Sequence, residues 1–395
     1  MRILLTHPIP LRYQRLGALE YDEIESVRIL RRLGHTVHLL TGVSRYHQPA
    51  EAHAFYGEHC PAIPLTVAAA FPRGGLAQRL IRPALWDGAA WDHAIPPFRA
   101  AFRQAVEAFR PDLVWAHSSF LWPVAEWAKQ RGLRTVVRSI NFEPVHYLQE
   151  SGRSAVNLIR YWAKVRGEAN AVRYADAFAA ISPAEVPYYV RLNPRKNIHL
   201  LPLLSLTLLL RAPRPVREVT PLHAFFMGAS YNIPHNRAAL AFLVEQVWPR
   251  LRAASPGAYV LHILGSKAPP ELAAQAAPDL IFEGYVPDLE TTLAGMDVAI
   301  VPSLWGMGMQ QKVFEPLCRA FPMVTHRRAL AGYPLTDGEA ALIADDADSF
   351  VQALMRLRAA ELRAQLSAGA AAWSAGLFSN LDQAVQALLE AAGKG

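Results

Sequence analysis

The sequence predicts an α/β protein built from two Rossmann-like domains, each a doubly wound parallel sheet, with a cleft between them. The chain has 395 residues, of which 52% are hydrophobic and 18% charged, so each half is long enough to bury its own core. In both halves, short apolar runs alternate with segments of helical period, as in βα repeats. A proline-containing stretch without clear periodicity, residues 202–221, interrupts this alternation and is expected to connect the domains.

Five apolar runs in the first half are predicted strands. Each is apolar over most of its length, which is typical of parallel strands that are covered on both faces. Helical patterns lie between them: Phe98, Phe102 and Phe109 recur at helical spacing, and Gly34 stands where a helix would end. The predicted strands span residues 3–5, 36–40, 113–116, 135–140 and 177–181.

The second half repeats the pattern. Its predicted strands span residues 223–227, 259–264, 280–282, 298–301 and 323–325, and its predicted helices span residues 235–253, 271–276, 288–294 and 310–319. A last helix is expected at residues 381–391. The resulting domains are residues 1–205 and 206–375, followed by a C-terminal segment, residues 376–395.

The charge is unevenly distributed between the two halves. Residues 1–200 contain 25 Lys and Arg against 16 Asp and Glu, a net charge of +9, whereas the whole chain carries +7. A basic domain favours an anionic partner such as a membrane surface, although dispersed basic residues can also serve solubility alone. No nucleic-acid motif is recognisable, so we expect no nucleic-acid partner. The uncharged stretch 202–210 is too short to span a bilayer. We therefore expect a cytoplasmic protein, with peripheral contact at the inner face of the cytoplasmic membrane as an open alternative.

Several ligand motifs are missing. No G-x-G-x-x-G follows the first predicted strand, and the two cysteines match no metal-ligand spacing. Asp346 and Asp348 have the spacing of an Asp-x-Asp metal motif, but they directly precede a helical pattern, where capping explains them. We therefore expect no metal and no cofactor. Four acidic residues, 20, 22, 23 and 25, are interpreted as helix-dipole partners in the first turns of the helix that ends near Arg32.

The most informative stretch is residues 297–315, which predicts a strand, a glycine-containing turn and a helix. Gly306 and Gly308 allow the backbone to approach a ligand closely, and amides at the start of the helix can face an anion. Lys312 adds a positive charge, and Glu315, three residues later, lies on the same helix face. A diphosphate would suit the amides and Lys312, and a diol would suit the carboxylate. Spacing alone leaves a second interpretation open, an ordinary turn followed by a Lys–Glu surface pair.

This stretch, together with residues 226–236 and 284–288, resembles the bacterial retaining glycosyltransferases of group four, which have the GT-B fold. The resemblance covers the second half in order and spacing. It is looser in the first half, where it rests on the opening strand, on residues 111–114 with His117 and on residues 138–143. The most similar members have a G-x-G-x-x-x-K-x-x-E turn and helix, with Met307 here in place of the first glutamate of the commoner E-x7-E signature.

The resemblance implies that residues 206–375 bind a nucleotide-diphospho-sugar such as a UDP- or GDP-sugar. The loop after Gly228 would approach the diphosphate or sugar, Tyr285 and Val286 would offer backbone atoms to the nucleobase, and Glu315 would take the ribose hydroxyls. Helix dipole and lysine would supply the charge that a metal supplies elsewhere. The implied donor-binding set is Gly228, Ser230, Tyr231, Tyr285, Val286, Gly306, Met307, Gly308, Met309, Gln310, Lys312 and Glu315.

The same resemblance makes residues 1–205 the acceptor-binding domain, to which the segment 376–395 returns. His117 and, at the next strand end, Arg138, Asn141 and Glu143 are the candidate catalytic residues. Each of them could instead be satisfied within the domain. A front-face transfer assisted by the leaving diphosphate needs no protein nucleophile, and Glu143 acting as a nucleophile or base is the alternative.

A basic segment of the first half is the candidate for membrane contact. Residues 71–86 combine apolar side chains with three arginines and no acid, which is typical either of an interfacial segment that meets anionic lipid or of a partly buried loop and helix.

The function expected is a hexosyltransferase of polysaccharide or glycoconjugate biosynthesis. It would move a sugar with retention to a glycan, lipid-linked or small-molecule acceptor. Two alternatives stay open: a sugar-nucleotide epimerase or hydrolase on the same fold, and a catalytically silent binding partner.

Overall fold

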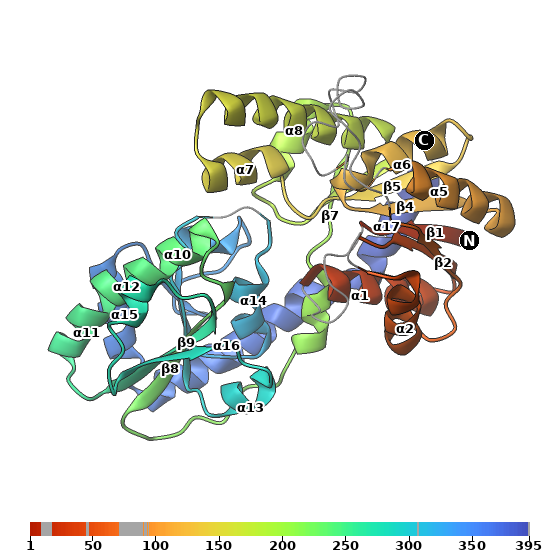
Figure 1. Cartoon of the computed structure of the whole chain (residues 1–395). Helices are drawn as coiled ribbons and strands as arrows, with labels where there is room; N and C mark the ends of the chain where they lie inside the picture. Colours follow the sequence, from red (N-terminus) through yellow and green to blue (C-terminus); the bar gives the residue numbers. More distant parts are fainter. Residues whose placement is uncertain are drawn as a thin grey trace. The chain divides into compact units, whose positions relative to one another are not determined.

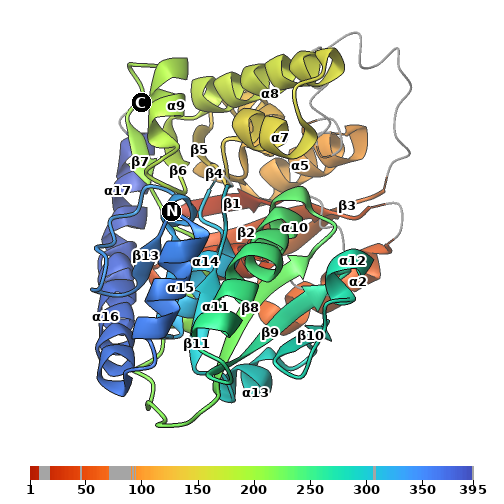
Figure 2. The same ribbon diagram turned by 90° about the vertical axis from the view of Figure 1, so that its left-hand side faces the viewer.

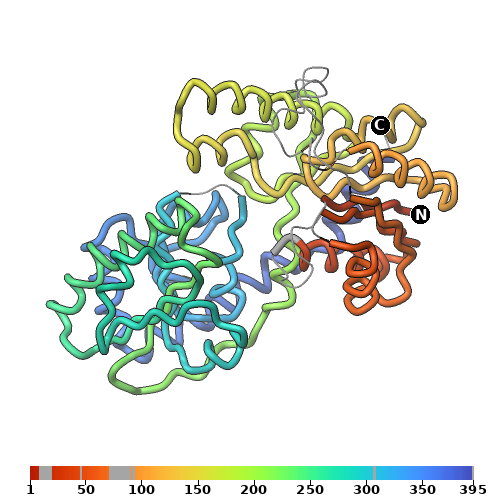
Figure 3. Tube along the Cα trace, in the orientation of Figure 1, coloured from red at the N-terminus to blue at the C-terminus, as the bar shows by residue number. Residues whose placement is uncertain are grey.

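A computed structural model describes residues 1–8, 18–44, 47–70, 90, 93, 95–305 and 308–393. The chain forms two compact units, which Figure 1 shows in sequence colours. Unit 1 comprises residues 1–205 and 380–395, and unit 2 comprises residues 206–379. The division falls inside the proline-containing stretch, and the chain comes back to unit 1 only with its last helix, a path that can be followed in Figure 3.

Unit 1 contains a seven-stranded sheet in the order β3-β2-β1-β4-β5-β6-β7. All its neighbouring strands are parallel, and the central pairing sets Leu5 beside Leu39 on one side and beside Trp115 on the other. The strand order reverses between β1 and β4, so the carboxyl ends of these two strands flank the switch point of the sheet. The strands are β1 (Arg2–Thr6), β2 (Thr36–Gly42), β3 (Leu65–Ala68), β4 (Leu113–His117), β5 (Arg134–Arg138), β6 (Ala177–Ala180) and β7 (Ile198–Leu200).

Helices connect these strands, and the last one comes from the C-terminal end of the chain. The helix α17 packs on β5 and β6 and buries Leu381, Val385, Leu388, Leu389 and Ala392. The helices of unit 1 are α1 (Ala18–Arg32), α2 (Pro49–His59), α5 (Pro96–Phe109), α6 (Trp122–Lys129), α7 (Glu143–Ser151), α8 (Ala155–Tyr174), α9 (Val186–Leu192) and α17 (Leu381–Gly393).

Unit 2 contains a six-stranded parallel sheet in the order β10-β9-β8-β11-β12-β13. Its order reverses between β8 and β11, which makes the carboxyl ends of these two strands the switch point. The strands are β8 (Leu222–Ser230), β9 (Tyr259–Ser266), β10 (Leu280–Gly284), β11 (Val298–Val301), β12 (Met323–His326) and β13 (Leu342–Ala344).

Helices cover both faces of this second sheet. The helix α11 packs with α15, and α14 packs with α16; Figure 2 shows α10 and α11 in front of β8. The predicted helix 235–253 is present as three consecutive pieces, because a π-helical turn, Phe242–Val247, separates α10 from α11. The helices are α10 (Pro234–Ala241), α11 (Trp248–Ala254), α12 (Pro270–Ala273), α13 (Leu289–Ala294), α14 (Gln311–Cys318), α15 (Ala347–Arg356) and α16 (Ala360–Phe378).

The ten strands expected from the sequence are all present, and the prediction of two doubly wound parallel sheets is confirmed. Three strands escaped the sequence analysis: β3, β7 and β13. Each lies at an edge of its sheet and is only three or four residues long. Most residues of β3 and β7 are half-buried or exposed, so the continuous apolar signal that marks a buried parallel strand is weak there, whereas β13 is largely buried but only three residues long.

Candidate functional site

The predicted donor-binding residues lie at the carboxyl-terminal ends of the strands of the second sheet. Because all its strands are parallel, the loops that follow β8, β10 and β11 leave from the same side. Gly228 and Ser230 stand at the end of β8, Tyr285 and Val286 follow β10, and residues 308–315 follow β11. Gly306 and Met307, which belong to the predicted set, lie outside the described residues.

The turn after β11 contains buried polar side-chain atoms without a hydrogen-bond partner among the described residues. Ser303 Oγ, Trp305 Nε1 and Gln310 Oε1 are buried and have no hydrogen-bond partner within the described ranges. Buried polar atoms are nearly always hydrogen-bonded, so these three atoms are available to a polar ligand, although such atoms also occur away from this turn, for example at Trp115 and Trp248. Gly308 has a φ of +73°, a conformation that glycine adopts without strain, and Met309 beside it is buried.

Lys312 contacts Asn236, which lies in the stretch 226–236 but is not among the predicted donor-binding residues. Its Nζ donates a hydrogen bond to Asn236 Oδ1, and Asn236 Nδ2 donates to the carbonyl oxygen of Ser230 at 2.9 Å. Asn236 is buried in the first turn of α10 and so links the end of β8 to α14 across the switch point. The Lys–Glu surface pair that the spacing allowed is not formed by Lys312 and Glu315. The available signal was an asparagine two residues after Pro234, the first residue of α10.

Glu315 is a buried carboxylate that already has hydrogen-bond partners within the protein. Its side chain is buried, Oε1 accepts a hydrogen bond from Arg319 Nε at 2.8 Å, and Oε2 accepts one from Gln311 Nε2 at 2.9 Å. Arg319 also pairs with Glu290 at 2.6 Å. An ionised carboxylate accepts about four hydrogen bonds, so these two contacts leave Glu315 capacity for ligand hydroxyls.

Tyr231 occupies a core position instead of the ligand-facing position that we expected. Its side chain is fully buried in the core of unit 2, and its hydroxyl donates to the carbonyl oxygen of Leu264 at 2.8 Å. The ring lies against Gly228, where an added Cβ would be 3.0 Å from it. Tyr231 therefore supports the loop after β8 from the core side. Ser230, by contrast, is half-buried, and its hydroxyl donates to Asn232 Oδ1 at 2.6 Å.

In unit 1, His117 and Arg138 belong to a buried polar cluster at the β1/β4 switch point. His117 Nε2 lies 3.0 Å from Asp22 Oδ2, and Arg138 forms an ion pair with the same carboxylate. Arg138 also donates to the carbonyl oxygen of Pro202 at 2.7 Å, and Asp22 accepts from the amide of Leu204. All three side chains are buried. We expected Arg138 to project toward a ligand, but it instead fastens α1 and β5 to the segment that leaves β7.

The charges in this cluster are set by burial and by mutual contact. Burial acts to raise the pKa of Asp22, but the charge of Arg138 and the hydrogen bonds from His117 and Arg138 outweigh it and lower that pKa to about 2. Burial lowers the pKa of His117, which favours the neutral imidazole. The sequence analysis assigned Asp22 to the helix dipole, because nothing in its spacing revealed a partner 116 residues away.

Asn141 and Glu143 do not join Arg138. Glu143 begins α7 and pairs with Lys164 of α8 at 3.3 Å, and the carbonyl oxygen of Asn141 accepts a hydrogen bond from Tyr189 at 3.1 Å. Behind them, burial raises the pKa of Glu168, and the nearby Glu143 raises it further. The four candidate catalytic residues therefore divide between two neighbourhoods, with His117 and Arg138 in one, and Asn141 and Glu143 in the other.

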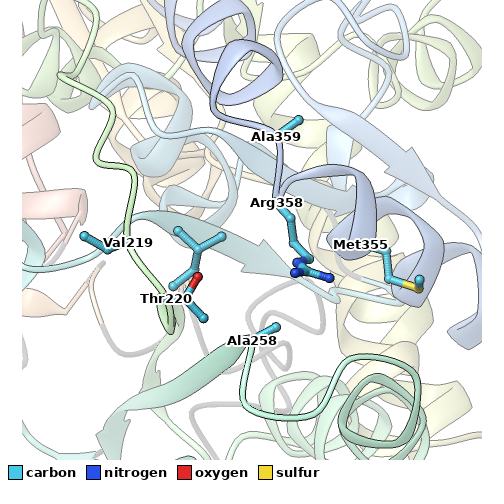
Figure 4. A pocket seen from close by; sticks show the side chains of 7 residues that line it. Val219, Thr220, Ala258, Met355, Arg358 and Ala359 are labelled. Carbon is cyan, nitrogen blue, oxygen red and sulfur yellow. The ribbon is translucent and has the colours of Figure 1, made fainter.

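A cavity of about 350 Å³ lies elsewhere in unit 2, at the amino end of β8. The predicted donor-binding residues lie at the opposite, carboxyl-terminal ends of the strands. The one charged residue that lines the cavity is Arg358 (Figure 4). This cavity is therefore separate from the candidate site. Its lining residues are Val219, Thr220, Leu222, Ala258, Met355, Arg358 and Ala359.

Two further findings concern metals and membranes. Asp346 caps α15 by accepting a hydrogen bond from the Ser349 amide at 2.8 Å, as expected, and Asp348 pairs with Arg250. No metal-binding group of three or more His, Cys, Asp or Glu is found in the part of the chain that is described. Among those same residues, no helix combines the length and the apolar character needed to cross a bilayer. The predicted membrane segment, residues 71–86, lies outside the described residues.

Two family models match the chain. The model described as "Glycosyl transferase 4-like domain" matches residues 25–203, and the model described as "Glycosyl transferases group 1" matches residues 222–359. No curated protein sequence matches the chain.

Solved structures share the fold across nearly the whole length. The structure of Anabaena HepE in complex with UDP and glucose has a TM-score of 0.65 at 16% identity and covers 99% of both chains. Sucrose-phosphate synthase from Thermosynechococcus elongatus has a TM-score of 0.69 at 16% identity and covers 98% of both chains. A complex of S. aureus TarM that contains UDP has a TM-score of 0.68 at 8% identity and covers 99% of both chains. With one family model on each unit and this shared architecture, the chain belongs to the group-four-like family of GT-B glycosyltransferases.

Proposed function

We propose that this glycosyltransferase takes its sugar from a UDP-sugar, held by unit 2, and transfers it with retention to a glycan, lipid-linked or small-molecule acceptor held by unit 1. The observation that carries the proposal is the turn after β11. There, Ser303, Trp305 and Gln310 contribute buried polar atoms for which the described residues offer no hydrogen-bond partner, and Lys312 stands in the first turn of the helix that follows. The presence of UDP in the HepE and TarM complexes supports the choice of base.

The charge at this turn suits a diphosphate. Amide groups in the first turn of a helix have no intrahelical acceptor and lie at the positive end of the helix dipole. Together with the ammonium group of Lys312 they would stabilise the negative charge that grows on UDP as it leaves. We therefore propose a transfer that requires no metal ion.

The proposed reaction breaks the bond between the anomeric carbon and the diphosphate oxygen. The acceptor oxygen forms its bond to that carbon on the same face, and its proton passes to the departing diphosphate. In this route the diphosphate itself is the base, so no carboxylate nucleophile is needed. The ion pair between Glu143 and Lys164 is consistent with this assignment, because it gives Glu143 a role in holding α7 to α8.

Calorimetric titration with UDP, GDP, ADP and uridine, in chelator and then in magnesium, tests the donor assignment. We expect UDP to bind most tightly, with an affinity that the chelator leaves unchanged. Binding of none of the diphosphates, or binding only in magnesium, would overturn the proposed site or its independence of metal.

Lys312→Ala tests the diphosphate contact directly. A charge-assisted hydrogen bond contributes about 1.5–3 kcal/mol, so UDP affinity should fall by on the order of tenfold or more, while uridine affinity changes little. Arg356→Ala is the matched control, because it removes one exposed positive charge at the far end of α15. Equal losses for UDP and uridine, or equal losses in both variants, would contradict the role of Lys312.

Product analysis then separates transfer from its alternatives. The proposal expects UDP release that depends on an added acceptor, with the anomeric configuration of the donor preserved in the product. Turnover of the donor alone would indicate an epimerase or hydrolase, and tight binding without turnover across acceptor classes would indicate a silent partner.

A further inference from the structure

The first half of α8 presents an unusual surface. The buried residues of this helix begin only at Ala163, whereas four large apolar side chains before that point are strongly exposed. Their exposed fractions are 58% for Val156, 42% for Leu158, 57% for Ile159 and 64% for Trp162. Single exposed apolar residues are ordinary, but four within seven positions of one helix mark an interaction surface. These four residues are called the α8 patch below.

The α8 patch follows the geometry of a helix. Ile159 and Trp162 are three residues apart, and Leu158 and Trp162 are four apart, so their side chains lie next to one another. The rings of Tyr161 and Trp162 meet edge to face, with centroids 5.4 Å apart. The result is a continuous apolar stripe that ends in an aromatic side chain.

The helix that carries the patch is held in place by its neighbour α7, beside which it lies in Figure 1. Ser154 caps it by accepting a hydrogen bond from the Asn157 amide at 3.2 Å. Asn157 also donates to the carbonyl oxygen of Ser151 at 2.7 Å and accepts from the Tyr147 hydroxyl at 2.8 Å. These contacts fix the connection between α7 and α8, so the patch is preformed and needs no folding on contact with a partner.

The charged side chains on the first half of α8 and its cap are basic, and the acidic residues of the neighbouring α7, Glu143 and Glu150, pair with Lys164 and His146. Residues 151–167 contain Arg153, Arg160, Lys164 and Arg166 and no acidic residue. Three of the four, the arginines, are exposed. Apolar and aromatic side chains interleaved with arginine are typical of helices that lie in a membrane interface and meet anionic headgroups. A second copy of the chain would bring the same basic stretch against itself, which like-charge repulsion opposes.

From this combination we infer that the α8 patch docks unit 1 on an anionic lipid surface. Trp162 and Ile159 would enter the boundary between headgroups and acyl chains, and Arg153, Arg160 and Arg166 would pair with lipid phosphates. Docking of the α8 patch on lipid is independent of the proposed sugar transfer, because UDP binding by unit 2 can be measured without any lipid.

Flotation with vesicles tests the inference. The full chain is mixed with vesicles of phosphatidylcholine alone or of phosphatidylcholine with phosphatidylglycerol. We expect flotation with the anionic vesicles, reduced by added salt, and little with the neutral ones. A chain that stays at the bottom of the gradient with anionic vesicles would overturn the inference.

Paired variants locate the contact. Ile159→Ser with Trp162→Ser removes the apolar part, and Arg153→Glu with Arg160→Glu reverses the charge. Each pair should lower the vesicle partition coefficient by on the order of tenfold or more. Met355→Ser and Arg103→Glu remove an exposed apolar and an exposed basic side chain elsewhere, and each should bind as the unaltered protein does. If the patch variants float unchanged, or if the controls lose as much, the inference is wrong.

Two control measurements exclude other causes of lost binding. The four substituted residues, two in the patch and two arginines beside it, are all exposed, so the melting temperature and the affinity for UDP should stay unchanged. Light scattering measures the mass of each variant in solution. A dimer that the Ile159→Ser and Trp162→Ser pair converts to a monomer would assign the patch to a contact between copies and overturn the lipid assignment.

Discussion

Burial determines what the polar residues at the strand ends of unit 1 do. Arg138 and His117 are in the positions that a ligand-binding residue would occupy, at the carboxyl ends of β5 and β4. Both side chains are fully buried, and both contact Asp22. A buried guanidinium needs charged and polar partners, and Asp22 with the carbonyl oxygen of Pro202 supplies them. The cluster thus joins three elements that are far apart in the sequence.

Asp22 should make the stability of the protein depend on acidity. Its pKa is lowered from 3.8 to about 2 in the folded state, so its contribution is complete above pH 3.8 and is lost as the pH falls toward 2. The difference corresponds to about 2 kcal/mol, because one pKa unit is about 1.4 kcal/mol. Urea unfolding measured across this range should show the loss in the unaltered protein.

The Asp22→Asn variant should lack this part of the pH dependence. It leaves Arg138 buried without its charged partner, so we expect it to be less stable by about 3–5 kcal/mol at neutral pH. Asp382→Asn is the control in the same unit, because its ion pair with Arg32 is exposed and contributes about 1 kcal/mol or less. Similar losses of unfolding free energy in the two variants would show that the buried cluster contributes no more to stability than an exposed ion pair.

At the scale of elements, the ends of β8 and β9 approach each other unusually closely. Gly265 has a φ of +138°, and a Cβ added there would lie 1.9 Å from the carbonyl oxygen of Gly228. The ring of Tyr231 packs against both glycines, since an added Cβ would lie 3.0 Å from it at Gly228 and 2.9 Å from it at Gly265. The loop after β8 is therefore held in place by a glycine on β9 and by a tyrosine of its own.

Gly265→Ala should disturb this arrangement. The clash and the unfavourable φ together should cost on the order of 2 kcal/mol or more of unfolding free energy, and the displaced loop should weaken UDP binding. Gly376→Ala is the control in the same unit, since Gly376 is an exposed helix residue with no atom within 4 Å of an added Cβ. It should stabilise the protein by about 0.5–1 kcal/mol. If Gly265→Ala unfolds at the same denaturant concentration as the unaltered protein, the expected clash does not occur.

At the scale of the whole molecule, the two units are not two consecutive halves of the chain. The first unit is completed by α17, which is separated from the rest of it by all of unit 2. The sheet strands β5 and β6 are covered by this helix. Unit 1 is consequently complete only after α17, which follows all of unit 2 in the sequence, has been made.

Leu388→Ala should therefore destabilise unit 1 more than unit 2. Leu388 is fully buried on α17, and replacing a buried leucine by alanine costs about 2–5 kcal/mol. Calorimetry should show one transition moved to lower temperature, while the transition that UDP raises stays in place. Gln383→Ala, on the exposed side of α17, should change stability by about 0.5 kcal/mol or less. If Leu388→Ala instead lowers the temperature of the transition that UDP raises, α17 does not stabilise unit 1 as we expect.

Much of the architecture was predictable because it depends on local patterns. Central strands such as β4 and β11 are buried along their whole length, and their continuous apolar runs made them predictable from the sequence. Edge strands such as β3 and β7 lack that coverage and were missed. Among the candidate site residues, the positions of Gly308 and Lys312 after β11 followed from the strand, turn and helix pattern, whereas the partner of Lys312 did not.

The sequence by itself determined the two parallel sheets, their repeating βα units and the edge from which the donor-binding loops leave, because periodicity and strand order are encoded residue by residue. Only the tertiary structure decided which polar side chains are buried and paired. Tyr231 and Arg138 carry the same functional groups whether they face solvent or a core, and the difference is made by partners distant in the sequence, Leu264 for one and Asp22 for the other. Free energies of burial and pairing depend on those three-dimensional neighbours, which no local spacing records.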